Sequence, residues 1–233
     1  MNDTLSPSAP PGRTHRTVLL VLAVLGTAAA ALVLRGPLMM VAPRCLSGNG
    51  YACYGTFNGV VLLTLLALPL SVLLVWALAH RRRRAGRAAP WRTSVAEVAM
   101  VHGTVPFVWM TMMPGSAPGV APARVSLVPL RDLVTMGPFG VIGNLLVLAA
   151  VGAFAPVRYA AVATLPRVLA LGAGCSALIE TAQYVFRLDR VSSVDDILVN
   201  ATGAALAGLV SRPWWAARPT APVRTSPYIP DAA

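Results

Sequence analysis

Long apolar runs separated by short polar stretches dominate this chain. An α-helix needs about 20 apolar residues to cross a bilayer. Six runs come close to this length or exceed it, and they cover residues 18–34, 56–79, 94–113, 138–155, 165–186 and 194–211. The pattern therefore predicts an all-α membrane protein, a polytopic helical bundle with six transmembrane helices.

Composition and charge support a membrane protein and argue against nucleic-acid binding. The mean hydropathy is +0.68, and only 12% of the 233 residues are charged. The net charge of +11 comes from 19 basic residues, all of them arginine. Because these arginines flank apolar runs, without interleaved aromatic residues or a nucleic-acid motif, we interpret them as topology signals.

The distribution of arginine predicts the orientation. Cytoplasmic segments of membrane proteins carry the excess of basic residues. Thirteen of the 19 arginines fall on one set of connecting segments, including the block at 81–92, if all six runs span. This arrangement predicts a multi-pass protein of the cytoplasmic membrane with both termini in the cytoplasm. A cleaved signal peptide is the alternative for 18–34, although the length of this run favours an uncleaved anchor.

These observations divide the chain into five parts. The terminal stretches are rich in Pro and lack apolar periodicity, so we expect them to be disordered. The arginine block separates a two-helix hairpin from a four-helix region. The parts are an N-terminal tail (1–17), a transmembrane hairpin (18–80), a basic cytoplasmic linker (81–93), a second transmembrane domain (94–212) and a C-terminal tail (213–233).

Two cysteines, Cys45 and Cys53, lie in the polar segment between the first two runs. The predicted orientation places this segment outside the cell, where a disulfide can form and persist. Two unpaired thiols are equally compatible with the spacing. Cys175, inside the fifth run, is most simply a small buried apolar residue.

Acidic residues are concentrated around the junction of the last two runs. The chain has eight, and four of them lie between positions 180 and 200. Ionisable groups at membrane depth are costly, so a cluster of them suggests a function. Glu180 and Gln183 share one helical face, and Asp196 and Asn200 share another. A buried Glu180 needs a partner, and we expect Arg190, Gln183 or Asn200 to supply it.

A structural interpretation explains part of this cluster. Ser193 precedes the last run and suits a helix N-cap, and acidic residues suit the first helical turn. Capping does not explain Glu180, Gln183 and Asn200, so we favour a functional external pocket over a purely structural clamp. The candidate residues are Glu180, Gln183, Arg190, Ser193, Asp195, Asp196, Asn200 and Asn144.

The same residues resemble the signature of the VanZ-like membrane family. That signature has an E-x-x-Q pair, an acidic turn that follows an arginine, and an N-x-x-G on the last helix. Here it corresponds to Glu180, Gln183, Arg190, Ser193, Asp195, Asp196, Asn200 and Gly203. Upstream, V-S-L-V-P-L (125–130) and G-N-L-L-V-L-A-A-V-G (143–152) are similar to two further family segments, with Ser126 in place of the usual Asn and Ala150 in place of the usual Pro. The resemblance covers roughly residues 95–210.

This resemblance implies reduced susceptibility to glycopeptide antibiotics, chiefly lipid-bearing ones such as teicoplanin. Our hypothesis is a non-enzymatic protein that binds a lipophilic or lipid-linked envelope ligand, with no cofactor and no metal. One alternative is an intramembrane enzyme that modifies an envelope lipid, with Glu180 as general acid or base and Asp195 or Asp196 holding a metal. Another is a structural subunit of a membrane complex. No hydrolase, metalloprotease, P-loop or dinucleotide motif is present.

Overall fold

The computed structural model describes residues 13–120 and 124–216, and these residues are mainly helical. The elements, in chain order, are α1 (Arg13–Leu46), α2 (Gly50–Tyr54), α3 (Phe57–Arg84), α4 (Pro90–Thr111), β1 (Arg124–Ser126), α5 (Leu133–Val147), α6 (Ala149–Arg158), η1 (Ala160–Val162), α7 (Leu165–Val185), β2 (Val191–Ser193), α8 (Val194–Ser211) and η2 (Arg212–Trp214). The chain forms two compact units, which divide within α3 between Leu63 and Thr64.

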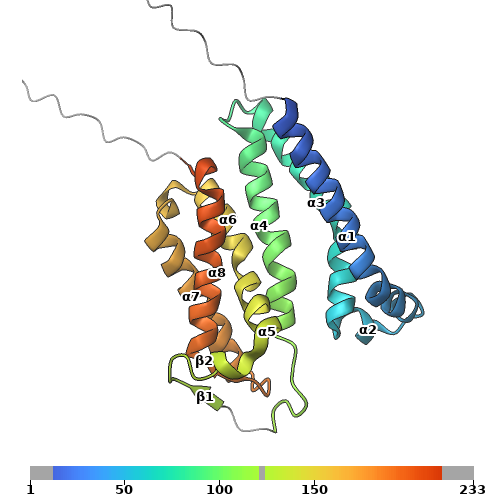
Figure 1. Cartoon of the computed structure of the whole chain (residues 1–233), viewed down its shortest axis with the longest axis vertical. Coiled ribbons are helices and arrows are strands. Elements are labelled where there is room, and N and C mark those ends of the chain that lie inside the picture. The colour runs from blue at the N-terminus through green and yellow to red at the C-terminus, as the bar shows by residue number, and fades with distance from the viewer. Residues whose placement is uncertain (1–12, 121–123, 217–233) are drawn as a thin grey trace, which may run out of the picture. The chain divides into compact units, whose positions relative to one another are not determined.

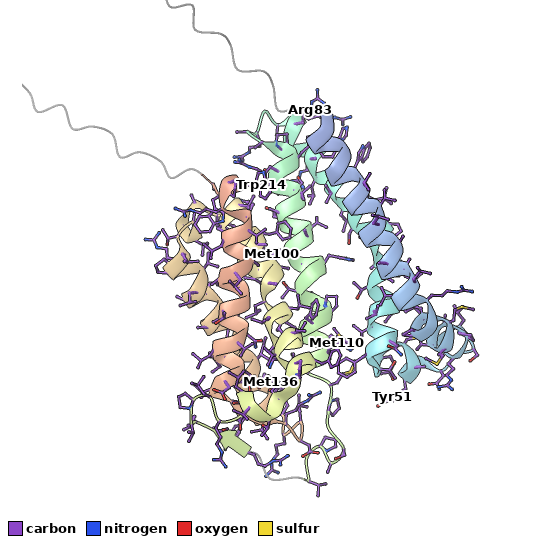
Figure 2. All side chains as sticks on the ribbon, viewed as in Figure 1. Tyr51, Arg83, Met100, Met110, Met136 and Trp214 are labelled. Atoms are coloured by element: carbon purple, nitrogen blue, oxygen red, sulfur yellow. A yellow bond between two sulfur atoms is a disulfide. The ribbon has the colours of Figure 1, made fainter. Side chains whose placement is uncertain are left out.

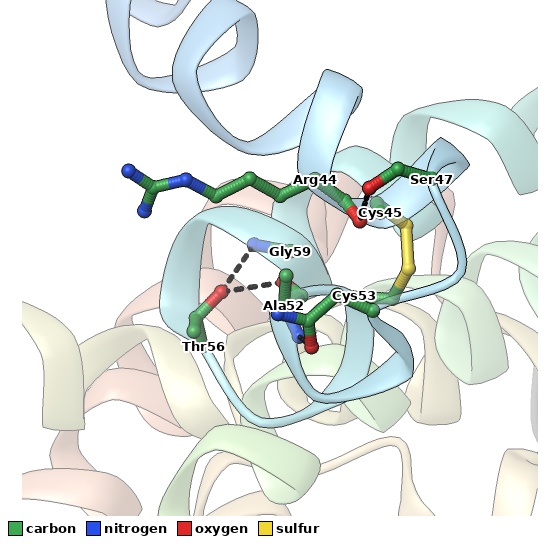
Figure 3. Close-up of a disulfide and its surroundings, with 8 residues drawn as sticks. Arg44, Cys45, Ser47, Ala52, Cys53, Thr56 and Gly59 are labelled. Carbon is green, nitrogen blue, oxygen red and sulfur yellow. Dashed lines mark hydrogen bonds between the residues drawn. A yellow bond between two sulfur atoms is a disulfide. The ribbon is translucent and has the colours of Figure 1, made fainter.

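The first unit contains a disulfide between Cys45 and Cys53, with 5.1 Å between the two Cα atoms (Figure 3). The sequence left this pairing open. On the far side of α2, the Thr56 hydroxyl donates to the carbonyl of Ala52 at 2.8 Å and accepts the amide of Gly59 at 3.1 Å. The covalent bond and these local hydrogen bonds together close the connection between α1 and α3.

Helix α8 lies at the centre of the second unit. It packs against α7, α6 and α5, and α4 packs against α6 on the side away from α7 (Figure 1). The apolar core of this unit is formed by Val147, Leu148, Val168, Ile179 and Ala204.

Glycine allows two of these helix contacts to be very close. A Cβ added at Gly203 of α8 would lie 2.0 Å from the carbonyl oxygen of Leu145 in α5. A Cβ added at Gly152 of α6 would lie 1.9 Å from the carbonyl oxygen of Ala204. Small residues at helix interfaces let backbones approach in this way. Gly203 therefore fixes the position of α8 against the helix that carries Asn144.

Four segments among the described residues are long and apolar enough to cross a membrane: Phe57–Arg84, Leu133–Arg158, Leu165–Val185 and Val194–Trp214. Large apolar side chains project outward from these helices (Figure 2). An apolar exterior of this kind is expected where the surrounding solvent is lipid. The structure thus supports a helical membrane protein.

The predicted run at 138–155 is divided in the structure. Pro138 follows Gly137, whose φ of 68° and ψ of 166° are not helical, so that a kink separates the first helical turn, 133–136, from the helix that begins at this proline. A second irregularity at Leu148, with φ of −114°, separates α5 from α6. Proline lacks the amide hydrogen that would continue a preceding helical turn, which accounts for the first break.

Candidate functional site

Two short strands bring distant parts of the polar cluster together. Strand β1 pairs with β2 in parallel, with Ser126 opposite Ser193. Strand β1 leads towards α5, whereas β2 leads directly into α8. The ends of α5, α7 and α8 therefore meet beside this pair of strands, at the end of the unit where Met136 lies and opposite Trp214 (Figure 2).

Ser193 is the hub of the hydrogen bonds at this end. Its backbone amide donates to Oε2 of Glu180 at 3.0 Å. Its hydroxyl donates to Oδ2 of Asp132 at 2.7 Å and accepts the amide of Asp195 at 3.1 Å. The last contact is the N-cap of α8 that the sequence predicted. One serine thus connects α7, α8 and the segment that precedes α5.

Asp195 has a structural role that its position in the sequence did not indicate. Its side chain is 1% exposed. Oδ1 accepts the amide of Leu130 at 2.5 Å, and Oδ2 accepts the amides of Asp132 and Leu133 at 2.8 and 3.1 Å. Leu130 has a positive φ of 65°, which is costly for a residue with a Cβ. Asp195 therefore stabilises both this strained turn and the start of α5.

Asp196 lies on the other side of the same helical turn and contacts Asn144. The amide group of Asn144 donates to Oδ1 of Asp196 and also lies 3.4 Å from the sulfur of Met136. This contact links α8 to α5 about two turns of α8 before the close approach at Gly203. The two consecutive aspartates thus bind different parts of the same neighbouring segment.

The partner of Glu180 differs from our expectation. We expected Arg190, Gln183 or Asn200, but the hydrogen bond that the structure gives the Glu180 carboxylate comes from the amide of Ser193. The Glu180 carbonyl also accepts the hydroxyl of Ser192 at 2.9 Å. The fold already fixes the position of a backbone amide, whereas a long side chain such as that of arginine loses conformational entropy when it is ordered. This difference favours the amide of Ser193 as the partner of Glu180.

The three residues expected to pair with Glu180 stabilise other parts of the fold. Gln183 donates to the carbonyl of Thr111 at 2.8 Å, and Arg190 donates to the carbonyl of Met113 at 3.1 Å. Both carbonyls belong to the C-terminal end of α4 or just beyond it, where backbone acceptors lack helical partners. Asn200 lies deeper in the bundle, and its amide group donates to the hydroxyl of Ser176 at 2.8 Å.

Asp189 ties the loop after α4 to the turn between α7 and β2. Its Oδ2 accepts the amide of Ala117 at 3.0 Å and the hydroxyl of Ser116 at 3.2 Å. Arg124 lies 3.5 Å from Oδ1. The Ala117 amide, followed by the Ser116 hydroxyl and the Arg124 charge, outweighs desolvation and holds the pKa of Asp189 below its ordinary value of 3.8.

Asp132 belongs to the cluster, although the sequence analysis did not single it out. The hydroxyls of Ser126 and Ser193 beside it hold the pKa of this carboxyl below its ordinary value of 3.8. The scarcity of acidic residues was the available clue, since Asp132 is one of only eight in the chain. Ser126, which replaces the asparagine usual in this motif, lies near this carboxyl, and its buried hydroxyl has no hydrogen-bond partner among the described residues.

A pocket of about 260 Å³ opens beside Glu180. Its lining comes from α7, β2, the start of α8 and the strand β1. Most lining side chains are apolar, and the polar ones lie near Glu180 and Ser193; the full set is Val125, Leu127, Ala177, Glu180, Thr181, Tyr184, Ser192, Ser193, Val194 and Ile197. A carboxyl group within an apolar wall suits an amphipathic ligand.

Metal-dependent chemistry gains little support from the donor arrangement. Both oxygens of Asp195 already accept backbone amides. Within 13–120 and 124–216, no group of three or more His, Cys, Asp or Glu residues is arranged to hold a metal ion.

The fold and the site define a helical membrane protein whose polar residues meet at one end of the bundle. A model of the VanZ/LLP1 family matches residues 70–215, and the chain belongs to this family. The match includes the whole polar cluster, which agrees with the resemblance seen in the sequence. No curated protein and no solved structure matches the chain.

Proposed function

We propose that the protein is a non-enzymatic binding protein of the cytoplasmic membrane, and that the pocket beside Glu180 holds a lipophilic or lipid-linked ligand of the cell envelope. The observation that carries this proposal is the position of the Glu180 carboxyl in a mostly apolar pocket. Ionisable residues inside membrane proteins usually mark functional positions because they are expensive to bury.

The contacts around Glu180 divide the polar cluster into two groups. Asp195, Gln183 and Arg190 are committed to backbone groups of neighbouring segments. Glu180 receives one amide and also lines the pocket. Its side chain therefore combines a fixed position with an oxygen that can accept a hydrogen bond or a positive charge from a ligand.

The apolar part of the pocket supports a ligand with a hydrocarbon chain. Leu127 is 75% exposed and Tyr184 is 45% exposed, and both line the opening. A ligand that places its polar group near Glu180 and its chain along these residues would keep its chain in contact with the bilayer. Family membership makes a lipid-bearing glycopeptide of the teicoplanin type one candidate, and a lipid-linked cell-wall intermediate another.

The proposal also includes a topology of six spans, in which α1 and α4 join the four segments described above. Helix α4 has 22 residues, which corresponds to about 33 Å at 1.5 Å per residue and is enough to span. The excess of arginine on the opposite connections supports an orientation with the Glu180 pocket on the external face. A single cysteine at Val191, in a chain without other cysteines, should react with an impermeant maleimide in intact cells; reaction only after permeabilisation would contradict this orientation.

Filling the pocket tests the binding proposal. Thr181 lines the pocket, whereas Leu178 on the same helix is 72% exposed and lies outside it. We expect Thr181→Trp to abolish binding of teicoplanin to the purified protein in mild detergent and to displace any retained lipid seen by mass spectrometry. Leu178→Trp, which adds the same side chain elsewhere on α7, should bind like wild type. Equal binding by wild type and both variants would contradict the proposal.

A further inference from the structure

A second pocket, larger and basic, lies at the opposite end of the same unit. Its volume is about 630 Å³, and four arginines line it: Arg81, Arg82, Arg87 and Arg158. Arg81 and Arg82 come from the last turns of α3, Arg87 from the turn that follows, and Arg158 from the end of α6. Ligand pockets in proteins commonly have volumes of about 300 to 1,000 Å³, so this one is large enough for a small molecule or a headgroup.

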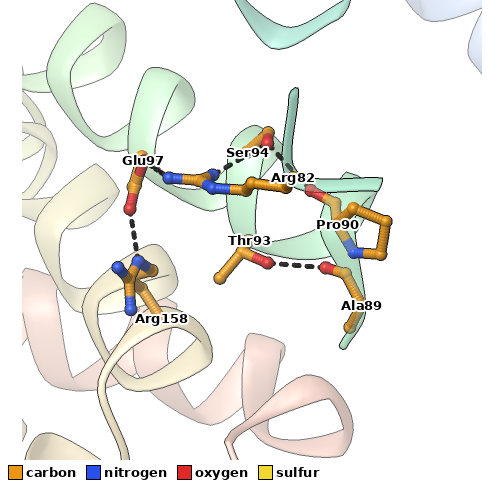
Figure 4. A network of polar contacts seen from close by, with 7 residues as sticks. All are labelled: Arg82, Ala89, Pro90, Thr93, Ser94, Glu97 and Arg158. Carbon is orange, nitrogen blue, oxygen red and sulfur yellow. Dashed lines mark hydrogen bonds and ion pairs between the residues drawn. The ribbon is translucent and has the colours of Figure 1, made fainter. Parts of the chain in front are cut away.

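A single carboxylate fixes two of these arginines in place. Glu97 of α4 forms ion pairs with Arg82 through one oxygen and with Arg158 through the other (Figure 4). Arg82 also donates to the hydroxyl of Ser94 at 2.8 Å, and Ser94 donates to the carbonyl of Pro90 at 2.8 Å. Three helices thus contribute to a rigid wall, which reduces the entropy that a ligand would lose on binding.

The pocket keeps a large positive charge after this pairing. Four guanidinium groups against one carboxylate leave a formal charge of +3. Arg81 and Arg87 are exposed, and their guanidinium groups have no hydrogen bond or ion pair among the described residues. Arginine binds phosphate with paired hydrogen bonds and remains charged at all physiological pH values. The chemistry of the pocket therefore suits an anion with several oxygen acceptors.

The position of the pocket indicates the source of this anion. Arg158 and Arg84 are the last residues of two candidate membrane spans, Leu133–Arg158 and Phe57–Arg84. The ends of such spans lie at the depth of the lipid headgroups, outside a hydrocarbon core of about 30 Å. Basic pockets between membrane helices at this depth bind anionic lipid headgroups.

We propose that this pocket is a binding site for the phosphate headgroup of an anionic membrane phospholipid. Glu97 orders Arg82 and Arg158, while Arg81 and Arg87 supply guanidinium groups that are free to contact the phosphate. Because this site and the Glu180 pocket are at opposite ends of the bundle, the two can be tested separately.

The arginine block provides a matched control for the experiment. Arg83 and Arg84 are exposed in the same block but do not line the pocket. The double variants Arg81→Gln/Arg87→Gln and Arg83→Gln/Arg84→Gln remove the same charge. Binding of dioctanoyl phosphatidylglycerol to the full chain in neutral detergent can be followed by native mass spectrometry, beside dioctanoyl phosphatidylcholine and inorganic phosphate.

Wild type should bind one phosphatidylglycerol saturably. The pocket variant should lose about tenfold or more in affinity, since each arginine near a headgroup contributes appreciably to attraction. The control variant should change less than about twofold by the same reasoning.

Equal losses of affinity in both variants would show that the whole arginine block attracts the lipid without a specific site, and would overturn the proposal. Inorganic phosphate binding as tightly as the lipid, or phosphatidylcholine binding equally well, would overturn the assignment to an anionic lipid. The two single variants, Arg81→Gln and Arg87→Gln, decide the matter if the pocket double variant does not fold.

Discussion

The carboxylate of Glu180 accepts the backbone amide of Ser193 at 3.0 Å, across the turn that joins α7 to α8. This contact positions an acidic side chain that has no basic partner at hydrogen-bonding distance within 13–120 and 124–216. The neighbouring arginine, Arg190, is instead bound to the carbonyl of Met113. Glu180 is thereby kept at the wall of the pocket, where it can contact a ligand.

Asp195 should be essential for stability. Its carboxylate accepts three amides from the segment that leads into α5, and a hydrogen bond to a charged group contributes about 1.5 to 3 kcal/mol. In Asp195→Asn, one oxygen is replaced by an NH₂ group that cannot accept an amide. We expect a loss of about 2 to 4 kcal/mol in the free energy of unfolding, measured by thermal or denaturant melts in detergent.

Asp196→Asn serves as the control for this prediction. The remaining oxygen of the new side chain can still accept the amide group of Asn144. We expect a smaller loss of stability in this variant than in Asp195→Asn. If the two variants melted at the same temperature, the assignment of a structural role to Asp195 would be wrong.

The contact between α8 and α5 should not tolerate a side chain at Gly203. A Cβ there would lie 2.0 Å from a backbone oxygen of α5, whereas one at Gly174 of α7 would meet nothing within 4 Å. We expect Gly203→Ala to lower stability by about 1 to 3 kcal/mol, because overpacking forces the helices apart. Gly174→Ala should be neutral or stabilising by up to about 1 kcal/mol. Thermal melts of both variants measure the difference, and equal melting temperatures would contradict this packing.

Acidification should release the loop that Asp189 holds. The pKa of this carboxyl lies below its ordinary value of 3.8, so the folded state binds its proton less readily than the unfolded state. The stabilising contribution is therefore fully present above the unfolded pKa and is lost as the pH falls through the lower, folded value. At neutral pH the loop should be fully held.

Amide exchange of Ala117, corrected for the pH dependence of intrinsic exchange, measures this release. Protection should fall below about pH 4, near the unfolded pKa of an aspartate. In Asp189→Asn the protection should be low throughout and should not change in this range. Wild-type protection that stayed constant down to pH 2, well below that pKa, would contradict the assignment.

Periodicity and capping made the last two helices predictable. The run at 194–211 coincides with α8, and Ser193 caps it as expected. The run at 165–186 differs from α7 by one residue. These limits follow from local chemistry: a serine before an apolar run at one end, and polar residues after it at the other.

The contacts inside the polar cluster could not be derived from the sequence, because they join residues far apart in the chain. Asp195 binds amides 62 to 65 residues before it, and Glu97 binds Arg158 at a separation of 61 residues. Helical spacing relates residues within one helix only. The family motif indicated which residues form the cluster. It did not indicate that Asp195 binds the amide of Leu130, whereas Glu180 binds the amide of Ser193.

The central claim is that Glu180 binds a ligand, and Glu180→Gln tests it most directly. Glutamine can accept the same amide of Ser193, so the melting temperature should remain close to that of wild type. Binding of teicoplanin or of the retained lipid should weaken about tenfold or more, since a charged hydrogen bond contributes about 1.5 to 3 kcal/mol. The measurement pairs a binding titration with a thermal melt of the same preparation. Unchanged binding, or a fall in melting temperature that accounts for the whole loss of binding, would contradict the account.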